Sequence, residues 1–304
     1  MIKIQVNKQH SLIGHKDCVY TLQRSAHKSK FFSGAGDGMV VLWDMEVPDK
    51  AEVIAKVSSS IYALDYCKFQ DLLVIGQNHD GVHLMEVQEK KHLGSLKLTT
   101  SRIFDIKILD KKIYIGTGEG ELIVVSKDEI TIEYRFRHSQ ESLRCFAVDP
   151  LNRLLIAGYS DNKIRVFDLD DYSLKQEISA HTNSIFSLCF SPDYKYLLSA
   201  GRDAHLKIWD ANNGFALHES IVAHMYTINH IVYSPDGNLF ATCSMDKSIK
   251  IWDAKAFKLL KVIDKARHAG HGTSVNKMMW SGYQGRLVSC SDDRTISVWD
   301  ISSP

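Results

Sequence analysis

Hydrophobic and polar residues alternate over short stretches of this chain, and turn-forming residues separate the stretches. Residues 184–192, SIFSLCFSP, are typical: apolar side chains alternate with small polar ones until the turn sequence PDY begins. A second and a third apolar run follow, with turns every ~8–12 residues. Short alternating runs between frequent turns predict β-strands, so we expect an all-β protein.

One phrase recurs along the chain. FFSGAGDGMVVLWD, LLSAGRDAHLKIWD, FATCSMDKSIKIWD and LVSCSDDRTISVWD each place Asp four residues after Ser or Thr and Trp six residues after that Asp. A Gly-His or Ala-His pair precedes each phrase. Alignment on the Trp position divides the chain into seven units of similar length. That position holds Trp43, Met85, Val125, Phe167, Trp209, Trp252 and Trp299.

Each unit is long enough for one sheet of four short strands. Such a sheet has two apolar faces and is not stable alone, whereas seven sheets packed radially cover one another. We therefore predict one domain over residues 1–304, a seven-bladed β-propeller of four-stranded antiparallel sheets. Residues 2–6 belong to no repeat, and we expect them to complete the last sheet and close the ring. The units end near residues 44, 86, 126, 168, 210, 253 and 300.

On these motifs the chain resembles the WD-repeat (WD40) β-propeller family over essentially its whole length. The resemblance implies that His, Ser or Thr, Asp and Trp form a hydrogen-bonded structural set in each blade that carries all four. The donors and acceptors of these side chains allow a continuous series of hydrogen bonds. Every polar atom in the series has a partner only when all four residues are present. A His-Ser-Asp trio also suggests a hydrolase, but its fourfold repetition with Trp favours a structural role. The complete sets are His15, Ser33, Asp37, Trp43; His181, Ser199, Asp203, Trp209; His224, Thr242, Asp246, Trp252; and His271, Ser289, Asp293, Trp299.

Three consecutive units depart from the pattern. The second has His79 in place of Asp and Met85-Glu86 in place of Trp-Asp, and the third has Glu119 and Val125-Ser126. The fourth keeps Asp161, with His138 before it, but has Ala157 and Phe167. Either these blades have drifted within a closed ring, or they are adapted to a partner.

Composition and charge narrow the class of protein. The 304 residues include 37 Lys and Arg against 36 Asp and Glu, so no net charge favours nucleic acid or an acidic membrane. No apolar run approaches the ~20 residues that span a bilayer, and the N-terminus has no secretory signal. The six cysteines never form C-x-x-C, which indicates reduced thiols. We expect a cytoplasmic protein, also nuclear if the cell is eukaryotic.

The candidate binding surface follows from positions that the repeat leaves free. In the family the Gly-His segment and the Asp turn lie at one end of each blade, called the top face, where the innermost strands open onto a central channel. We expect one position per strand to ring the channel mouth, although its side chains could instead extend the core between blades. Arg and Asn at three of these positions favour contact with water. The ring is Tyr20, Tyr62, Phe104, Arg144, Phe186, Asn229 and Asn276.

The residue before each turn Asp also faces this rim. These residues are Gly36, Asn78, Gly118, Ser160, Arg202, Met245 and Asp292. With the two glycines leaving space, we hypothesise an aromatic slot between Tyr20 and Phe104 that holds a Lys or Arg of a peptide. Arg102 adds charge, and the longer loop at 264–272 offers Lys265, Arg267 and His268 as a basic projection or as ordinary solvated residues.

We expect a non-enzymatic scaffold that binds a protein or peptide segment at the channel mouth, as a monomeric propeller within a multiprotein complex. The partner-binding candidates are the seven ring residues with Arg102, Arg202, Met245 and Asp292. No catalytic residue, metal ligand, cofactor or membrane partner is predicted. Two alternatives stay open. An RNA-binding propeller would need a stronger basic surface, and an enzyme would need carboxylates or histidines at the mouth, where Asp292 is the one carboxylate.

Overall fold

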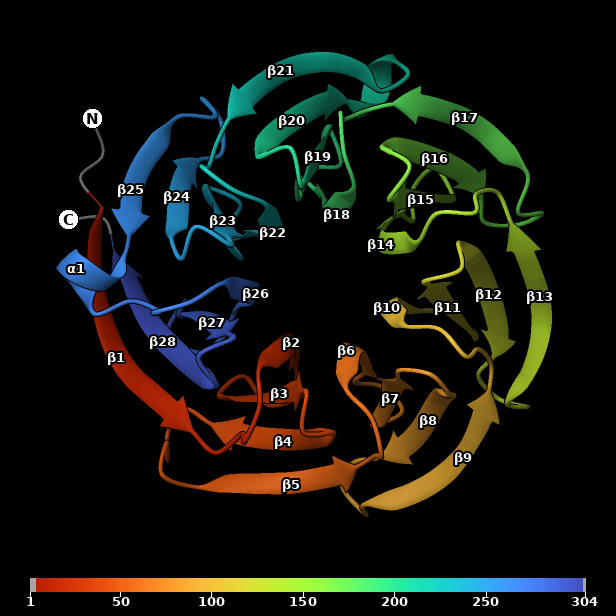
Figure 1. Ribbon diagram of the computed structural model, residues 1–304, viewed down its shortest axis with the longest axis horizontal. Coiled ribbons are helices and arrows are strands. Elements are labelled where there is room, and N and C mark those ends of the chain that lie inside the picture. The colour runs from red at the N-terminus through yellow and green to blue at the C-terminus, as the bar shows by residue number, and fades with distance from the viewer. Residues whose placement is uncertain (1–3, 303–304) are drawn as a thin grey trace.

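The computed structural model describes residues 4–302, and its strands form a closed ring of seven sheets (Figure 1). Each sheet has four antiparallel strands stacked outward from a central axis. The innermost strands are β2 (Val19–Arg24), β6 (Ile61–Cys67), β10 (Ile103–Leu109), β14 (Leu143–Asp149), β18 (Ile185–Phe190), β22 (Ile228–Tyr233) and β26 (Val275–Trp280). The second strands are β3 (Lys30–Ala35), β7 (Leu72–Gln77), β11 (Lys112–Thr117), β15 (Leu154–Tyr159), β19 (Tyr196–Gly201), β23 (Leu239–Ser244) and β27 (Leu287–Ser291).

The third strands carry the aligned Trp position. They are β4 (Met39–Asp44), β8 (Gly81–Glu86), β12 (Glu121–Ser126), β16 (Lys163–Asp168), β20 (His205–Asp210), β24 (Ile249–Asp253) and β28 (Thr295–Ser302). The outer strands are β5 (Ala51–Lys56), β9 (Lys91–Lys97), β13 (Thr131–Arg137), β17 (Leu174–Ser179), β21 (Ala216–Val222), β25 (Leu259–Ile263) and β1 (Gln5–Ile13). Two short helices, η1 (Ala211–Asn213) and α1 (Lys265–His268), lie in connections. We number the blades 1 to 7 from the one that contains β2 to the one that contains β26.

The ring closes through β1, which pairs antiparallel with β28 from Gln5 opposite Ser302 to Ile13 opposite Thr295. The predicted closure is confirmed, but the predicted bounds of 2–6 are wrong, and residues 2–3 lie outside the described residues. The strand runs on to Ile13, and β28 pairs along its length except at a bulge between Lys8 and His10. Figure 1 shows the red β1 outside the blue β28.

The core lies between adjacent blades. Between blades 7 and 1, for example, Leu22 and Phe31 pack with Met279 and Val288, and all four are buried. Full burial of one such side chain stabilises the fold by about 1.5–3 kcal/mol. Each blade thus depends on its neighbours.

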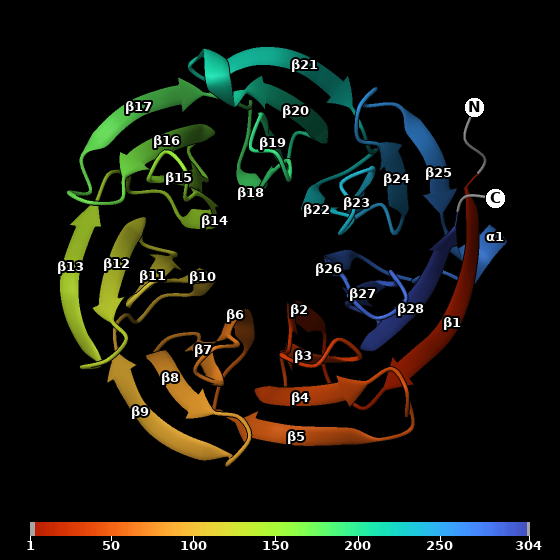
Figure 2. The same cartoon turned by 180° about the vertical axis from the view of Figure 1, so that it is seen from behind.

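The two faces of the ring carry different connections. In Figure 1 helix α1 lies in front of β1, and in Figure 2, seen from behind, it lies behind that strand. Figure 1 therefore views the top face, which holds the loops into the innermost strands and the Asp turns. Within residues 4–302 no helix is both long and apolar enough to cross a membrane. All six cysteines are free thiols, three of them buried.

Candidate functional site

A β-bulge marks the same point of every innermost strand. The register between the first two strands of blade 1 shifts between Val19 and Thr21, and the other six blades shift at the equivalent place. A bulge leaves one residue out of the ladder and redirects its side chain. The seven residues within the shifts are the seven that the sequence analysis assigned to the ring. All seven are half-buried, and all line a central cavity of about 580 Å³.

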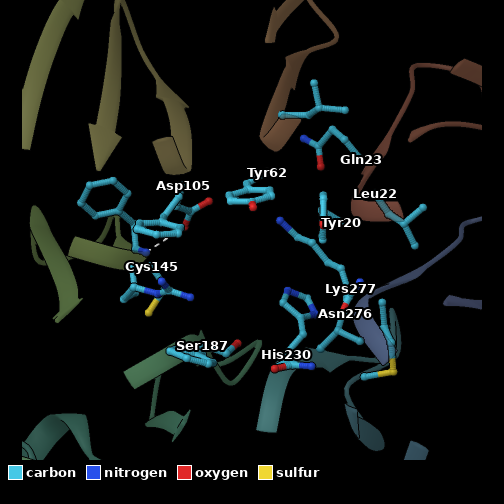
Figure 3. A pocket seen from close by; sticks show the side chains of 18 of the residues that line it. Tyr20, Leu22, Gln23, Tyr62, Asp105, Cys145, Ser187, His230, Asn276 and Lys277 are labelled. Carbon is cyan, nitrogen blue, oxygen red and sulfur yellow. Dashed lines mark hydrogen bonds between the residues drawn. The ribbon is translucent and has the colours of Figure 1, made fainter. Parts of the chain in front are cut away.

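Five of these side chains form a continuous arc around the mouth. The rings of Tyr20 and Tyr62 meet edge to face at 4.5 Å between centroids, and Tyr62 stacks on Phe104 at 6.0 Å. The Arg144 guanidinium then lies 3.7 Å from the Phe104 centroid and 4.3 Å from that of Phe186. Figure 3 looks into this cavity, with Tyr20 and Tyr62 at its wall.

The hypothesis of a slot for a partner's cation is not supported by this geometry. Arg144 itself covers one face of Phe104, and the stacked Tyr62 covers the other. The two glycines do not leave space either. A Cβ on Gly36 would lie 2.6 Å from a carboxylate oxygen of Asp17, and one on Gly118 would lie 2.3 Å from Oγ of Ser101. The aromatic arc is already occupied by the protein's own cation.

Three arginines share the mouth. Arg102 and Arg202 are exposed on the top loops of blades 3 and 5, on either side of Arg144 in blade 4. Burial, together with the charges of Arg102 and Arg202, lowers the pKa of Arg144 to about 10. Arg144 is therefore still a cation at neutral pH. Within residues 4–302 no carboxylate pairs with any of the three, so their charge is available to a ligand.

The two asparagines of the ring connect neighbouring blades. The Asn229 amide donates to the backbone oxygen of Val275 at 2.8 Å, and the Asn276 amide donates to that of Val19 at 2.9 Å. Asn276 also donates to Asp292 at 2.7 Å. These N–H groups are committed to the fold, which leaves the arginines and aromatics as the more available part of the mouth.

An exposed apolar patch lies on the top face of blade 6. Met225 is 82% exposed, Tyr226 60% and Met245 56%. The loops that carry them are joined, because the Met245 N–H donates to the Thr227 carbonyl at 2.9 Å. Met245 was predicted from the sequence, whereas Met225 and Tyr226 were not. A signal was present: the two residues after His are Lys16 and Asp17 in blade 1 but Met and Tyr in blade 6.

Charged groups that were not predicted from the sequence lie inside the channel. The residue that directly follows the mouth position faces the cavity in three blades. These residues are Asp105 on β10, His230 on β22 and Lys277 on β26, and Lys107 lies two residues further along β10. Figure 3 shows Lys277 and His230 pointing into the opening. The prediction that Asp292 is the one carboxylate concerned the mouth alone and did not cover these deeper residues. The bulge is the reason, since it lets two consecutive residues face inward.

The four complete sets of His, Ser or Thr, Asp and Trp are connected as the family pattern implies. In blade 5 the Trp209 indole N–H donates to Ser199 Oγ at 2.8 Å, and that oxygen lies 2.7 Å from Nε2 of His181. Nδ1 of His181 lies 2.9 Å from Asp203. Because a carboxylate faces Nδ1, we assign the imidazole proton to Nδ1, so Nε2 accepts from the serine. The same bonds occur in blades 1, 6 and 7.

These sets hold their groups in fixed charge states. Burial lowers the pKa of His181 and outweighs the hydrogen bond and charge of Asp203, so the imidazole is neutral. Burial raises the pKa of Asp203, but the hydrogen bond from His181 and the backbone N–H groups of Thr182 and His205 lower it more. His224 and Asp246 behave in the same way. These histidines and aspartates therefore stabilise the blades.

Blade 4 replaces the set with an ion-pair cluster. Ser139, not His138, stands 22 residues before Asp161 and donates to it at 2.7 Å. The guanidinium of Arg165, a residue only 3% exposed, bonds to Asp161 and to Glu177, each at 2.8 Å. In blades 2 and 3 the stand-ins form looser contacts. His79 donates to the Thr100 carbonyl at 2.8 Å, and Thr100 donates to Glu119 at 3.5 Å.

The loop at 264–272 is not a free basic projection. Arg267 pairs with Asp264 at 2.6 Å, and Asp264 also caps helix α1. Lys8 of β1 donates to the Ala269 carbonyl at 3.0 Å, which fixes the loop against the closing strand. Among residues 4–302 no three His, Cys, Asp or Glu side chains gather closely enough to hold a metal ion.

Known proteins similar to this chain have the same repeat. The family model described as WD domain, G-beta repeat matches residues 6–44, 131–168, 172–210, 216–253 and 262–300, more than half of the chain. The unmatched stretch from 45 to 130 contains blade 2 and the three inner strands of blade 3, and the motifs of both blades are degenerate. Among solved structures, the WD40 β-propeller domain of Doa1 aligns with a TM-score of 0.84 over 97% of each chain, at 17% identity. That likeness concerns the fold alone.

Curated relatives match at lower coverage. The WD repeat-containing protein 91 homolog of Dictyostelium discoideum is 23% identical over 68% of this chain and 28% of its own length. Human striatin-3 is 27% identical over 66% of this chain and 27% of its own. The pre-mRNA-splicing factor PRP46 of Candida albicans is 36% identical over 22% of this chain and 18% of its own. The chain thus spans under a third of the length of these relatives.

Proposed function

Because the chain belongs to the WD40-repeat family, we propose that it is a non-enzymatic interaction scaffold that binds an acidic segment of a partner protein across the channel mouth. The observation that carries the proposal is the unpaired arginine group, Arg102, Arg144 and Arg202, with Arg144 held between Phe104 and Phe186. Relatives whose names denote a splicing factor and a striatin support a role in multiprotein assemblies.

The charge of the site determines the kind of segment. Arginine pairs strongly with carboxylates because its planar fork makes two parallel hydrogen bonds. Stacking between two aromatic rings fixes the fork of Arg144, so little side-chain entropy is lost when a ligand binds. Tyr and Arg are also the residues most enriched at binding hot spots. We therefore infer a segment with Asp or Glu side chains directed at the mouth.

The apolar patch on blade 6 supplies a second contact. Met225, Tyr226 and Met245 lie on the same face as Arg202, in the next blade. Methionine and tyrosine are enriched in interface cores, and flexible methionines adapt to varied apolar side chains. The segment we propose thus combines acidic residues with a neighbouring apolar residue.

Single-stranded RNA fits the site less well. Binding of single strands relies on bases stacked on free aromatic faces. Here Tyr62 and Arg144 cover both faces of Phe104, and Arg144 also covers one face of Phe186. Three arginines around the mouth are a small electrostatic surface for a nucleic acid.

A display library of random peptides tests the proposal. We expect the wild-type protein to enrich peptides that carry Asp or Glu next to an apolar residue. Arg144→Met removes the charge at similar size, and we expect it to weaken the selected peptides by roughly tenfold or more. Arg102→Glu with Arg202→Glu should shift the selection toward Lys and Arg.

The matched control reverses two lysines on the opposite face, Lys28→Glu with Lys258→Glu, and should leave peptide affinity unchanged. Enrichment of neutral or basic peptides by the wild type would contradict the proposal, as would equal affinity of the Arg144→Met variant. In a parallel arm, saturable RNA binding with steep salt dependence that Arg144→Met abolishes would favour the nucleic-acid alternative.

A further inference from the structure

The interior of the channel, below the mouth, carries a concentration of positive charge. Among residues 4–302, five basic side chains line the cavity of about 580 Å³, and Asp105 is the one carboxylate in its wall. The basic residues are Arg24, Arg102, Lys107, Arg144 and Lys277. The whole chain has a net charge of only +1, so this excess is local.

The carboxylate in the wall is committed to the fold. One carboxylate oxygen of Asp105 accepts a hydrogen bond from the backbone N–H of Ile106 at 3.0 Å. The other oxygen accepts from the backbone N–H of Phe146 in the next blade at 2.8 Å. Asp105 therefore ties the innermost strands of blades 3 and 4 together. It lies more than 4.0 Å from either channel lysine, since no ion pair joins them in the described chain.

The channel lysines have no partner among residues 4–302. Neither the Lys107 nor the Lys277 ammonium makes a side-chain hydrogen bond or an ion pair there, and Nδ1 of His230 is buried without a partner. Polar groups taken out of bulk water normally gain partners in compensation. A cluster of donors that the fold does not satisfy indicates a ligand that accepts.

These groups also lie close enough to act on one another: the charge of Asp105 raises the pKa of Lys107, and the ammonium groups of Lys107 and Lys277 repel each other. Burial lowers the pKa of Lys277, Asp105 opposes this, and the charge of Lys107 lowers it further. Burial likewise lowers the pKa of His230, with the charges of Lys277 and Lys107 adding to it. An anion between the two ammonium groups would relieve this repulsion, whereas a metal cation would increase it.

We propose that the channel interior binds a small organic molecule that carries a phosphate group, held by Lys107 and Lys277 with Arg144 at the entrance. A phosphate offers acceptor oxygens in several directions and suits convergent lysines. The cavity is of the size that proteins use for small ligands and exceeds what one phosphate ion fills. This site lies beneath the proposed peptide surface and shares only Arg144 with it, while Lys107 and Lys277 belong to the channel site alone, so each site can be present without the other.

Phosphorus NMR and titration calorimetry test the site with two probes, inorganic phosphate and glycerol 3-phosphate, at ionic strength matched with sodium chloride. We expect saturable one-to-one binding, tighter for glycerol 3-phosphate, and no binding of glycerol. Lys277→Met and Lys107→Met should each weaken binding by roughly tenfold or more, because each loses one charge-assisted hydrogen bond. Lys91→Met, on the exposed outer strand β9, is the matched control and should bind as the wild type does.

For the Lys277→Met variant, folding does not confound this test. Removal of an unpaired lysine from a channel relieves repulsion, so we expect the melting temperature of the Lys277→Met variant to equal or exceed that of the wild type. The proposal is overturned if neither probe shows saturable binding or if Lys277→Met binds both as tightly as the wild type. Loss of peptide binding in the Arg102→Glu, Arg202→Glu variant with phosphate binding retained would separate the two sites.

Discussion

Blades 4 and 5 are neighbours in the ring, and each joins its top loop to the strands beneath through buried polar side chains. Blade 5 uses a neutral chain from Trp209 through Ser199 and His181 to Asp203. Blade 4 uses a cation, Arg165, between two carboxylates. The backbone sheets are alike, with four strands in the same order. One blade geometry is thus compatible with two chemistries, a hydrogen-bonded chain and an ion-pair cluster.

The two chemistries differ in what happens when one member is lost. The neutral chain loses hydrogen bonds, each with a modest net contribution but a larger cost if a buried partner stays unpaired. The ion-pair cluster loses a charge and leaves carboxylates without a counter-ion, which costs more. Variants of the two blades should therefore differ in stability.

Arg165→Met in blade 4 is expected to have the largest effect. It leaves Asp161 without its cation beneath the top loop, and we expect the free energy of unfolding to fall by about 3 kcal/mol. Chemical denaturation measures this. Asp161→Asn in the same molecule should recover part of the loss, since the unpaired charge is gone. A loss below that of the blade 5 variant described next would contradict the comparison.

Ser199→Ala in blade 5 should cost less, about 2 kcal/mol. The change removes the hydroxyl that joins Trp209 to His181 and leaves one polar atom of each without its partner. The same denaturation assay applies. Ser199→Thr is the matched control, because Thr242 fills this position in blade 6, and it should retain most of the stability. If alanine and threonine are equally destabilising, lost packing rather than lost hydrogen bonding is the cause.

Acidification should destabilise blades 5 and 6, which contain buried histidines, at a higher pH than blade 4. The pKa values of His181 and His224 are lowered in the fold, so below about pH 6.5 the unfolded chain takes up protons first and stability falls. The loss is at most about 1.4 kcal/mol per pH unit for each histidine. Asp203, Asp246 and Asp161 also have lowered pKa values, but their contribution is lost only at more acid pH, below about 3.8.

Hydrogen exchange resolves this effect by blade. Between pH 7 and pH 5 we expect protection factors to fall in β19 and β23 before they fall in β15, because Arg165 does not titrate and Asp161 stays ionised. The exposed His138 of blade 4 also has a lowered pKa, chiefly through burial of part of its ring and then the charge of Arg165, and should have a smaller effect. Equal loss in all three strands would indicate a global acid response.

The sequence predicted what the repeat encodes. The spacing of His, Ser or Thr, Asp and Trp predicted the seven blades, and aligned positions such as Tyr20 and Arg144 were found together at the channel mouth. What it did not predict depends on contacts between units. The stacking of Arg144 between Phe104 and Phe186 joins three blades, and the bulge that turns Lys277 inward breaks the alternation on which strand patterns rest. Arg165 was missed because it stands opposite Ala157, outside the repeat's motif.

The smallest expected effect belongs to Lys163→Met, which removes the ion pair of Lys163 with Glu177 on the outer strands of blade 4. Both side chains are about one-third exposed, so water already solvates them, and exposed pairs contribute roughly 0–1 kcal/mol. We expect a change within about 0.5 kcal/mol in the same denaturation assay. Because Glu177 also pairs with Arg165, this variant asks whether the cluster depends on its number of charges or on the buried guanidinium. A loss as large as that of Arg165→Met would mean that an extended network of surface charges stabilises blade 4. The difference between blades 4 and 5 would then be that one uses exposed and the other buried polar groups.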